Sequence, residues 1–297
     1  MKETPLVTVI CLCYNQEKYV VEALNSVINQ SYKNIEILVL DDCSDDNSAA
    51  VIQNWLLNYP KVQFISNNQN VGNTKSFNQA AKFATGDYLI DLATDDILNP
   101  NCIALQIDAF QKSTHSNLGM VYGNAENIHE NGSFDSYYFH VDGDQKVISK
   151  RPTGNIYTSI LAGGNCMCSV SAMIKKEVFD RLQGFDENLY YEDLDFWIRV
   201  ARSYNFDFID AVLVKKRKLS NSLGAQFFER KEISKNINST TYQILKKAFK
   251  LNKTKEENKA LLKRVHFEIE LNLKNKNFSL LLKLLVLKLK INLKILF

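Results

Sequence analysis

The feature that most constrains the fold of this chain is the alternation of short apolar runs with helical patterns over residues 1–125. The apolar runs are Leu6–Leu12, Ile35–Leu40, Val62–Ile65, Tyr88–Leu92 and Met120–Tyr122. Helical patterns lie between them, at Lys18–Asn29, Ser48–Asn58 and Asn73–Ala84, and a further helix is opened by Asn99 and Pro100. Continuous apolar runs are typical of parallel strands buried on both faces. The alternation therefore predicts an α/β fold with a mostly parallel sheet flanked by helices.

The pattern weakens in the rest of the chain. Residues 126–165 are rich in Asn, Gly, Ser, Asp and Tyr, which indicates loops and edge strands, and Lys215–Gln226 has the composition of a basic loop. The sequence predicts a strand over Ser169–Ile174, and helices over Lys175–Leu182, Glu192–Tyr204, Arg230–Lys250 and Lys255–Leu273. We expect three parts: residues 1–125, residues 126–226 and a basic helical tail over residues 227–297.

The net charge of +3 conceals an uneven distribution along the chain. Ala211–Phe297 contains 21 Lys and Arg against 6 Asp and Glu, whereas residues 1–210 contain 15 against 27. This balance indicates that only the tail meets an anionic surface. Four lysines interrupt the apolar stretch Phe278–Phe297, which favours a helix lying in the membrane interface over a transmembrane span. The alternative is a helix packed on the body or on a second subunit. Nucleic acid is not an expected partner, because no base-reading motif is present.

The six cysteines are expected to be buried, reduced thiols of a cytoplasmic protein. No C-x-x-C pair occurs, and a C-x-C pair such as Cys11 and Cys13 supplies only two of the four ligands of a structural zinc. We expect no secretory signal peptide, because the opening residues include an acidic residue and only a short apolar run follows.

Three polar clusters follow predicted strands, namely Cys13–Glu17, Leu40–Asp46 and Leu92–Asp96. Ligands of such sheets bind at the carboxyl ends of the strands, so the two acidic clusters are expected to converge on one edge. The ring of Tyr14 can stack on a base, and a carboxylate can accept a hydrogen bond from a pyrimidine N–H. Carboxylate oxygens also suit Mg²⁺ or Mn²⁺. Taken alone, the first and third clusters suit a helix-capping turn equally well, and Leu40–Asp46 suits one better.

A fourth cluster, Gly184–Glu187 followed by Tyr190–Trp197, surrounds the start of a predicted helix. The helix dipole stabilises carboxylates at this position, and one of them can instead be the base that deprotonates an acceptor hydroxyl. Glu192 and Asp195 share a helix face, while Asp193 faces elsewhere.

Taken together and in this order, the four clusters resemble the family 2 glycosyltransferases with the GT-A fold, over roughly residues 5–225. Val7–Asn15 is similar to the family's first strand and nucleotide-binding turn, and Ile37–Ser44 to its strand ending in Asp-Asp-Gly-Ser. Asn78–Asp96 is similar to the stretch that leads to its D-x-D-type metal site, and the residues from Gly184 to Asp193 match its acceptor-side signature.

The resemblance implies an inverting enzyme that moves a sugar from a nucleotide-sugar, most often a UDP-sugar, to a glycan or lipid-linked glycan hydroxyl. It implies that residues 1–125 form the donor-binding half of a Rossmann-like GT-A domain and residues 126–226 the acceptor-binding half. The residues implied to bind the nucleotide-sugar are Leu12, Tyr14, Glu17, Asp42, Lys75, Asp95 and Asp96. Asp96 would also bind Mn²⁺ or Mg²⁺, Asp193 would be the catalytic base, and Glu192 and Trp197 would lie on the acceptor side. We expect the enzyme to be cytoplasmic, peripheral at the inner face of the cell membrane, and to build a surface polysaccharide or glycolipid.

The sequence departs from the family pattern in places. Cys43 replaces the glycine of Asp-Asp-Gly-Ser, and Leu219 stands where the family often has a metal-binding histidine. The run Lys215–Lys218 is expected either to hold the diphosphate or to be a solvated loop. Phe77 stands where an arginine is often found, and Lys75 is the expected substitute.

Two other functions remain as alternatives. A sugar nucleotidyltransferase has a similar sheet, but it needs a glycine-rich loop after the first strand, and Cys11–Glu17 contains no glycine. A non-enzymatic sugar-nucleotide-binding or scaffold protein would have a degenerate site, which the intact acidic residues at positions 42, 95, 96 and 193 argue against.

Overall fold

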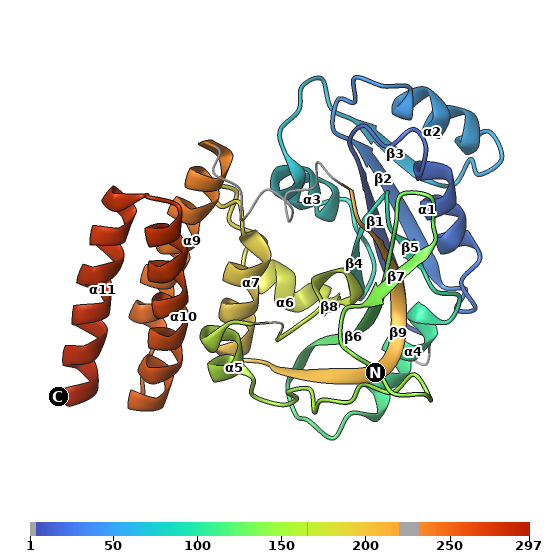
Figure 1. Cartoon of the computed structure of the whole chain (residues 1–297). Helices are drawn as coiled ribbons and strands as arrows, with labels where there is room; N and C mark the ends of the chain where they lie inside the picture. Colours follow the sequence, from blue (N-terminus) through green and yellow to red (C-terminus); the bar gives the residue numbers. More distant parts are fainter. Residues whose placement is uncertain (1–3, 165, 220–231) are drawn as a thin grey trace. The chain divides into compact units, whose positions relative to one another are not determined.

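The computed structural model of the protein describes residues 4–164, 166–219 and 232–297 (Figure 1). The chain divides into two compact units, each made from several stretches of sequence. Unit 1 comprises Met1–Gly154, Met167–Gly184 and Asn205–Lys218. Unit 2 comprises Asn155–Cys166, Phe185–Tyr204 and Leu219–Phe297.

The first half of unit 1 is a parallel sheet with helices on both faces. Its strands, in the order β3-β2-β1-β4, are β1 (Val7–Cys13), β2 (Ile35–Asp41), β3 (Gln63–Ser66) and β4 (Tyr88–Ala93). Helices α1 (Val20–Ile28) and α2 (Ser48–Leu56) cover one face and α3 (Asn73–Ala81) covers the other (Figure 1). Every residue of β1 is buried, which is the burial expected of an internal strand covered on both faces.

The second half of the sheet contains both strand orientations. Its strands are β5 (Ile97–Leu98), β6 (Leu118–Ile128), β7 (Phe134–Tyr137), β8 (Met173–Lys175) and β9 (Asn205–Arg217). β8 runs antiparallel to both β4 and β6 and so joins the two halves, whereas β6 and β9 form a long parallel ladder. Helix α4 (Cys102–Lys112) packs on β6 and β9, and α6 (Lys176–Arg181) follows β8. Most paired residues are parallel, so the predicted class of a mostly parallel sheet flanked by helices is confirmed.

Some predicted elements differ in extent or kind. β6 continues to Ile128, so it enters the region expected to be irregular, and Ser169–Ile174 begins with a 3-10 turn before β8. Lys215–Arg217 belong to β9 rather than to a loop, because pairing with β5 and β6 imposes a strand that the local composition does not favour. The helix after Pro100 has Asn101 at its N-cap position without a capping hydrogen bond from the side chain, while the side chain of Asn99 donates to a carbonyl of β9. Residues 220–226 of the expected loop and residues 230–231 of the expected helix lie outside the described residues.

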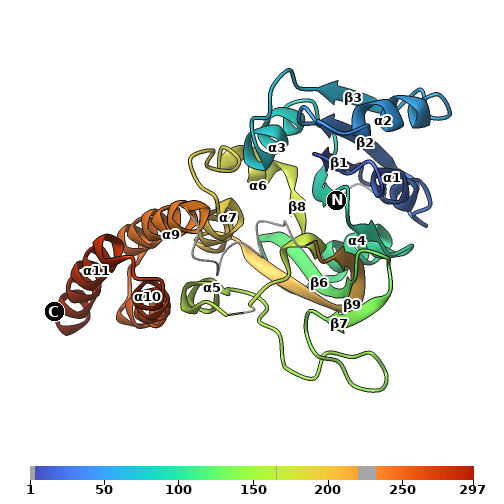
Figure 2. The ribbon, with the colours of Figure 1, turned by 45° about the horizontal axis from the view of Figure 1, so that its top comes forward.

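The regular elements described in unit 2 are helices. They are α5 (Tyr157–Ala162), α7 (Glu192–Ala201), α9 (Glu232–Leu251), α10 (Lys255–Lys274) and α11 (Phe278–Leu296). Helices α9, α10 and α11 lie side by side in both ribbon views (Figures 1 and 2). A capping box starts α10, in which the Thr254 hydroxyl and the Glu257 carboxylate each accept from the other residue's backbone N–H. The six-residue α5 was not predicted, since it is too short to show a helical period.

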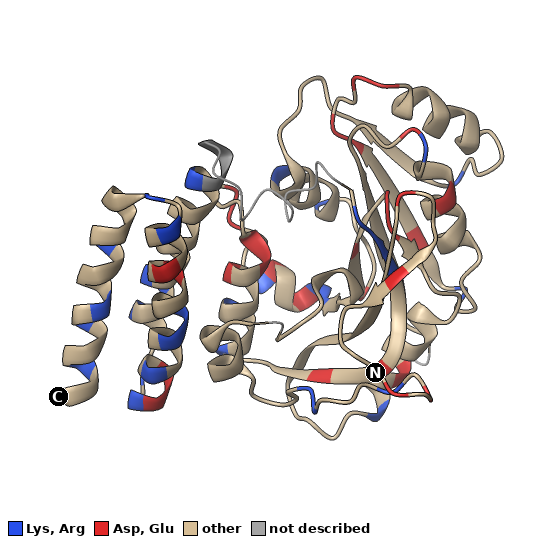
Figure 3. Cartoon of the chain, viewed as in Figure 1, with Lys and Arg blue, Asp and Glu red and all other residues tan. Residues whose placement is uncertain are grey.

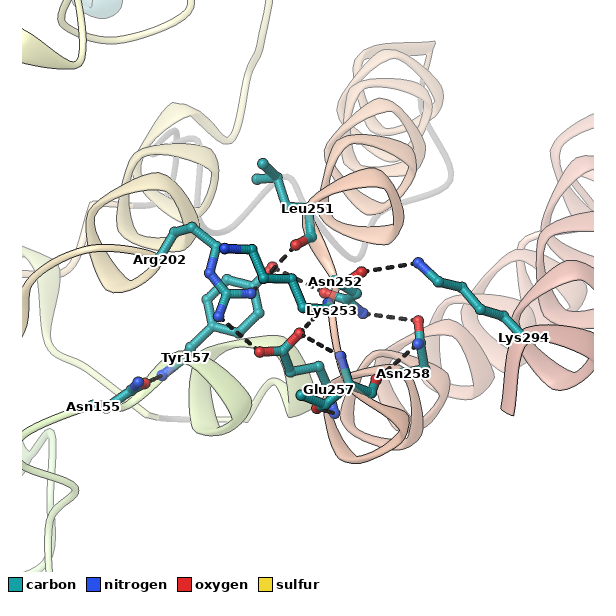
Figure 4. A network of polar contacts seen from close by, with 10 residues as sticks. Asn155, Tyr157, Arg202, Leu251, Asn252, Lys253, Glu257, Asn258 and Lys294 are labelled. Atoms are coloured by element: carbon teal, nitrogen blue, oxygen red, sulfur yellow. Dashed lines mark hydrogen bonds and ion pairs between the residues drawn. The ribbon is translucent and has the colours of Figure 1, made fainter. Parts of the chain in front are cut away.

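Polar contacts tie the junction of α9 and α10 to α5, α7 and α11 (Figure 4). Arg202 donates to Glu257 (2.8 Å), and its guanidinium carbon lies 4.0 Å from the centre of the Tyr157 ring. The Tyr157 hydroxyl donates to Asn252 Oδ1 (2.9 Å), and Lys294 of α11 donates to the Asn252 carbonyl (2.9 Å). Burial alone would raise the pKa of Glu257, but its hydrogen bonds to Arg202 and to backbone N–H groups lower it. The basic tail is therefore packed into the same unit as α7.

Helix α11 contacts both α9 and α10, so one of its faces packs on the other helices of the tail. None of the described helices is both long enough and apolar enough to cross a bilayer.

Candidate functional site

The carboxyl ends of β1, β2 and β4 meet where the strand order of unit 1 reverses. β1 lies between β2 and β4, which is the position where open α/β sheets bind ligands. The backbone N–H of Asp42 donates to the Cys13 carbonyl (2.9 Å), and the backbone N–H of Thr94 donates to the Leu12 carbonyl (3.0 Å). Leu12 is buried, so it contributes to this edge through its carbonyl. The predicted convergence of the acidic clusters is thus present in the structure.

The loops after β1 and β2 hold each other by hydrogen bonds. Asn15 Oδ1 accepts from the backbone N–H of Asp45 (2.7 Å). The Glu17 carboxylate accepts from the backbone and side-chain N–H groups of Asn47, both at 3.0 Å. Tyr14 is exposed at this edge, and its hydroxyl donates to the Asp45 carboxylate (3.3 Å). Glu17 therefore joins the two loops, and Tyr14 presents an anchored ring to solvent.

Asp42 holds the segment between β3 and α3. The residue is 5% exposed, and its carboxylate accepts from the backbone N–H groups of Val71 (3.0 Å) and Gly72 (2.7 Å) and from the Asn67 side chain (2.8 Å). A carboxylate offers about four lone-pair directions, so one remains for a ligand. Asp42 thus positions the segment from Asn67 to Gly72, a role that the sequence pattern did not indicate.

Cys43 has a backbone φ of 60°, in the left-handed region where a β-carbon is strained. The turn is closed by Asp41, whose carboxylate accepts from the Ser44 backbone N–H (3.1 Å) and hydroxyl (2.5 Å). This conformation explains why glycine is favoured at the position of Cys43 in sequences of the Asp-Asp-Gly-Ser type.

Asp95 and Asp96 form a crowded pair of carboxylates after β4. Asp96 is buried and its Oδ1 accepts from the backbone N–H of Arg217 (2.8 Å). Burial raises the pKa of both carboxyl groups, and the charge of Asp95 raises that of Asp96 further. The positive charges of Lys216 and Arg217 oppose these shifts.

The donor set of this pair fits a divalent cation that is shared with a substrate. Among the described residues, no group of three or more His, Cys, Asp and Glu side chains is arranged to hold a metal ion. Mg²⁺ and Mn²⁺, however, are commonly bound by one or two carboxylates together with substrate phosphates and water. Asp95 and Asp96 supply such a pair.

Arg217, at the end of β9, holds the backbone of the acidic pair. Its Nε donates to the Asp95 carbonyl (3.0 Å), Nη1 to the Glu130 carbonyl (2.8 Å), and Nη2 pairs with Glu22 of α1 (2.7 Å). The guanidinium also lies over the Tyr19 ring, 4.5 Å from its centre. All three nitrogens of the guanidinium have partners and the side chain is buried. Arg217 is therefore neither a diphosphate ligand nor a residue of a solvated loop. Sequence reasoning missed this role, because an arginine inside a basic run carries no signal of burial.

The other cations of the site differ in their surroundings. The charge of Lys216 acts on both Asp95 and Asp96. Lys218 is exposed and pairs with Asp135 (2.6 Å). Lys75 is exposed on the first turn of α3, directly after the segment held by Asp42. Lys216 and Lys75 are therefore candidates for contact with a diphosphate.

In unit 2, the first turn of α7 carries several carboxylates with different partners. Asp195 is 2% exposed and is held by Arg199 (2.7 Å) and Lys247 (3.0 Å). Lys247 also pairs with Asp186, whose pKa burial alone would raise but hydrogen bonds to Lys247 and Asn188 lower. Asp195 and Asp186 thus have structural roles.

Asp193 is half-buried on the same turn, and its Oδ1 accepts from the backbone N–H of Leu194 (2.7 Å). Glu192 is half-buried at the first residue of α7, and Trp197 is buried one turn later. Trp197 offers little surface to an acceptor, and the acceptor-side roles of Glu192 and Trp197 stay predictions.

Comparison with family models matches residues 8–183 of this chain to "Glycosyl transferase family 2". The matched residues run from β1 to just beyond α6 and include Tyr14, Asp42, Asp95 and Asp96.

Among curated proteins, the chondroitin synthase of Escherichia coli is 27% identical over 213 residues, which cover 71% of this chain and 29% of the relative. An uncharacterized glycosyltransferase of Rickettsia bellii is 30% identical over 215 residues, covering 72% of this chain and 30% of the relative. The chain therefore spans about three-tenths of the length of these relatives.

Among solved structures, a fragment of S. aureus TarS in complex with UDP has a TM-score of 0.63 and 18% identity, covering 86% of this chain and 70% of that chain. This likeness is one of fold.

Proposed function

The chain belongs to glycosyl transferase family 2, and from this premise we propose that it transfers a sugar from a nucleotide-sugar to a hydroxyl acceptor, with inversion at the anomeric carbon. The family predicted from the four clusters is thereby confirmed. The observation that carries the proposed reaction is the gathering of Tyr14, Asp42 and the Asp95–Asp96 pair at one edge of the sheet in unit 1. This edge offers a ring for the base and crowded carboxylates for the cation of a diphosphate.

The proposed donor is a UDP-sugar. Tyr14 would stack on the base, and Asp42 would accept from uracil with its remaining lone-pair direction. The solved structure of TarS with UDP supports this choice. Lys75 and Lys216 would face the diphosphate as positive charges.

We place Mn²⁺ or Mg²⁺ on Asp96, with Asp95 beside it. The bound cation would neutralise charge on the leaving nucleoside diphosphate. Arg217 holds the Asp95 carbonyl through its side chain and Asp96 Oδ1 through its backbone N–H, so it fixes the pair before the donor binds.

The proposed base is Asp193. Its carboxylate would take the proton of the acceptor hydroxyl, and the hydroxyl oxygen would bond to C1 of the sugar. The bond between C1 and the diphosphate oxygen would break, with its electron pair leaving on the nucleoside diphosphate. Asp195 is less suited to this role, because it is 2% exposed and its carboxylate is held by Arg199 and Lys247, whereas Asp193 is only half-buried.

The proposed product is a surface polysaccharide or glycolipid, made in the cytoplasm at the inner face of the membrane. The chondroitin synthase among the relatives supports polymer synthesis, and the basic tail supports a site at an anionic surface.

Thermal unfolding with UDP or GDP, with and without Mn²⁺, tests the donor site. We expect the midpoint to rise with UDP and Mn²⁺ together, because a ligand that binds only the folded state stabilises it. Asp96→Asn should abolish the Mn²⁺-dependent part of the shift. A rise with GDP alone would replace the UDP assignment, and no rise with any nucleotide would favour the scaffold alternative.

The base is tested separately with Asp193→Asn. We expect this variant to keep the UDP response of the wild type and to lose transfer. Transfer that persists in Asp193→Asn would exclude Asp193 as the base.

A further inference from the structure

Helix α11 has two apolar faces, of which one is covered. Leu280, Leu284, Leu287 and Ile291 are buried, and their spacing of four, three and four residues defines a single helix face. This face accounts for the packing of α11 on α9 and α10.

The second apolar face points the opposite way. Its exposed residues include Phe278, Leu282, Leu285, Leu289, Leu293 and Leu296, and the exposed Val286 lies at its edge. They also recur at three- and four-residue intervals, and at 100° per residue they lie about half a turn from the buried face. An exposed apolar row along a whole helix marks a contact surface in a soluble protein.

The charges of α11 have one sign. The helix contains Lys283, Lys288, Lys290 and Lys294 and no acidic residue, as the blue segments in Figure 3 show. Lys294 is bound to the carbonyl of Asn252. By helical position, Lys283 and Lys290 border the exposed apolar row on one side and Lys288 on the other.

We propose that the exposed row of α11 lies on a lipid surface that carries anionic headgroups. The leucines would enter the acyl boundary while the bordering lysines reach the headgroups, with the helix parallel to the surface. A second copy of this chain fits the row less well, because two such helices would bring lysines together without an acidic residue on α11 to pair with them. This inference rests on the membrane location proposed above and does not depend on the transfer reaction.

The test is flotation of the full chain with vesicles of phosphatidylcholine alone or mixed with phosphatidylglycerol. We expect binding to the mixed vesicles that weakens with salt. A variant combining Leu282→Gln, Leu289→Gln and Leu293→Gln should bind at least about tenfold less. All three side chains are exposed, so the variant should keep the thermal midpoint of the wild type. Leu57→Gln, which changes the exposed leucine directly after α2, is the matched control and should bind as the wild type does.

Three results would overturn the proposal: no binding of the wild type to mixed vesicles, equal binding of the triple variant, or a dimer that the triple variant dissociates without any vesicle binding. The rise of the thermal midpoint with nucleotide, measured on the same samples, tests the proposed transfer reaction separately from membrane binding. If the thermal midpoint rises with UDP and Mn²⁺ but the protein does not bind vesicles, the membrane proposal is wrong and the proposed transfer reaction is unaffected.

Discussion

At the scale of residues, the candidate site contains two residues whose positions lower the stability of the folded protein. Asp96 is buried beside another carboxylate, and Cys43 occupies a left-handed backbone position. Such costs are commonly found at functional sites, where a ligand or a required geometry compensates for them. Both residues lead to predictions of stability.

Asp96→Asn should stabilise the protein without ligand. The fold raises the pKa of Asp96 above its unfolded value, so the group favours folding at low pH, and this contribution is lost as the pH rises from about 4 through the folded pKa. Each unit of that shift corresponds to about 1.4 kcal/mol. In urea unfolding, the gain of the variant over the wild type should therefore grow with pH. A variant that is less stable than the wild type at alkaline pH would contradict the pKa shift.

Cys43→Gly should also stabilise the protein, by up to about 1 kcal/mol, because glycine adopts a φ of 60° without strain. Cys43→Ala is the matched control, since it removes the thiol and keeps the β-carbon, and it should give no gain. Midpoints of chemical unfolding decide between them. Equal gains in both variants would assign the effect to the thiol instead.

At the scale of elements, β9 links the sheet to the acidic pair. It pairs with β6 in parallel and with β5 in the opposite orientation, and it ends at Arg217. Arg217 reaches Glu22 on α1 and the Asp95 carbonyl after β4, so one side chain ties three elements together.

Arg217→Lys should destabilise the protein by about 2 kcal/mol or more, because lysine keeps the charge but its single nitrogen cannot reach the partners that Nε, Nη1 and Nη2 of the arginine contact. Lys218→Gln is the neighbouring control. It removes an exposed ion pair with Asp135 and should cost less than about 1 kcal/mol. Urea unfolding measures both. Equal losses would mean that the contacts of Arg217 contribute no more than those of a surface charge.

At the scale of the whole molecule, the tail and α7 belong to one unit. Unit 2 takes in α5, α7 and the three C-terminal helices, although residues 202–231, which include β9, separate α7 from α9 in the sequence. The expected division at residue 227 follows the order of residues in the sequence. In the structure, the contacts place the tail in the same unit as α7, the helix that carries Asp193.

A chain that ends before Glu232 should be poorly soluble or should lose about 10 °C or more in Tm. Removal of α9 and α10 uncovers the parts of α7 and α5 that contact them, and the burial of apolar surface on these parts is lost. Thermal unfolding followed by circular dichroism tests this. A truncated protein that melts like the full chain would show that the tail is an independent appendage.

The amino-acid sequence by itself determined the α/β class, the family and the acidic ends of two strands. Buried parallel strands need continuous apolar runs, and ligand-binding loops at the ends of these strands need polar residues. Both features can be recognised from short stretches of sequence such as Val7–Cys13 and Asp95–Asp96. The elements β1 to β4 and α1 to α3 were accordingly predicted within a few residues of their bounds.

Only the tertiary structure decided the roles of Arg217, Asp42 and Asp195. Each is a charged residue whose neighbours in sequence suggest solvent or ligand, yet each is buried and satisfied by partners far along the chain. The extent of β9 was also decided by the tertiary structure, because long-range pairing with β6 imposes a strand that the local composition does not favour. In α11, packing on α9 and α10 determines which of the two apolar faces is covered.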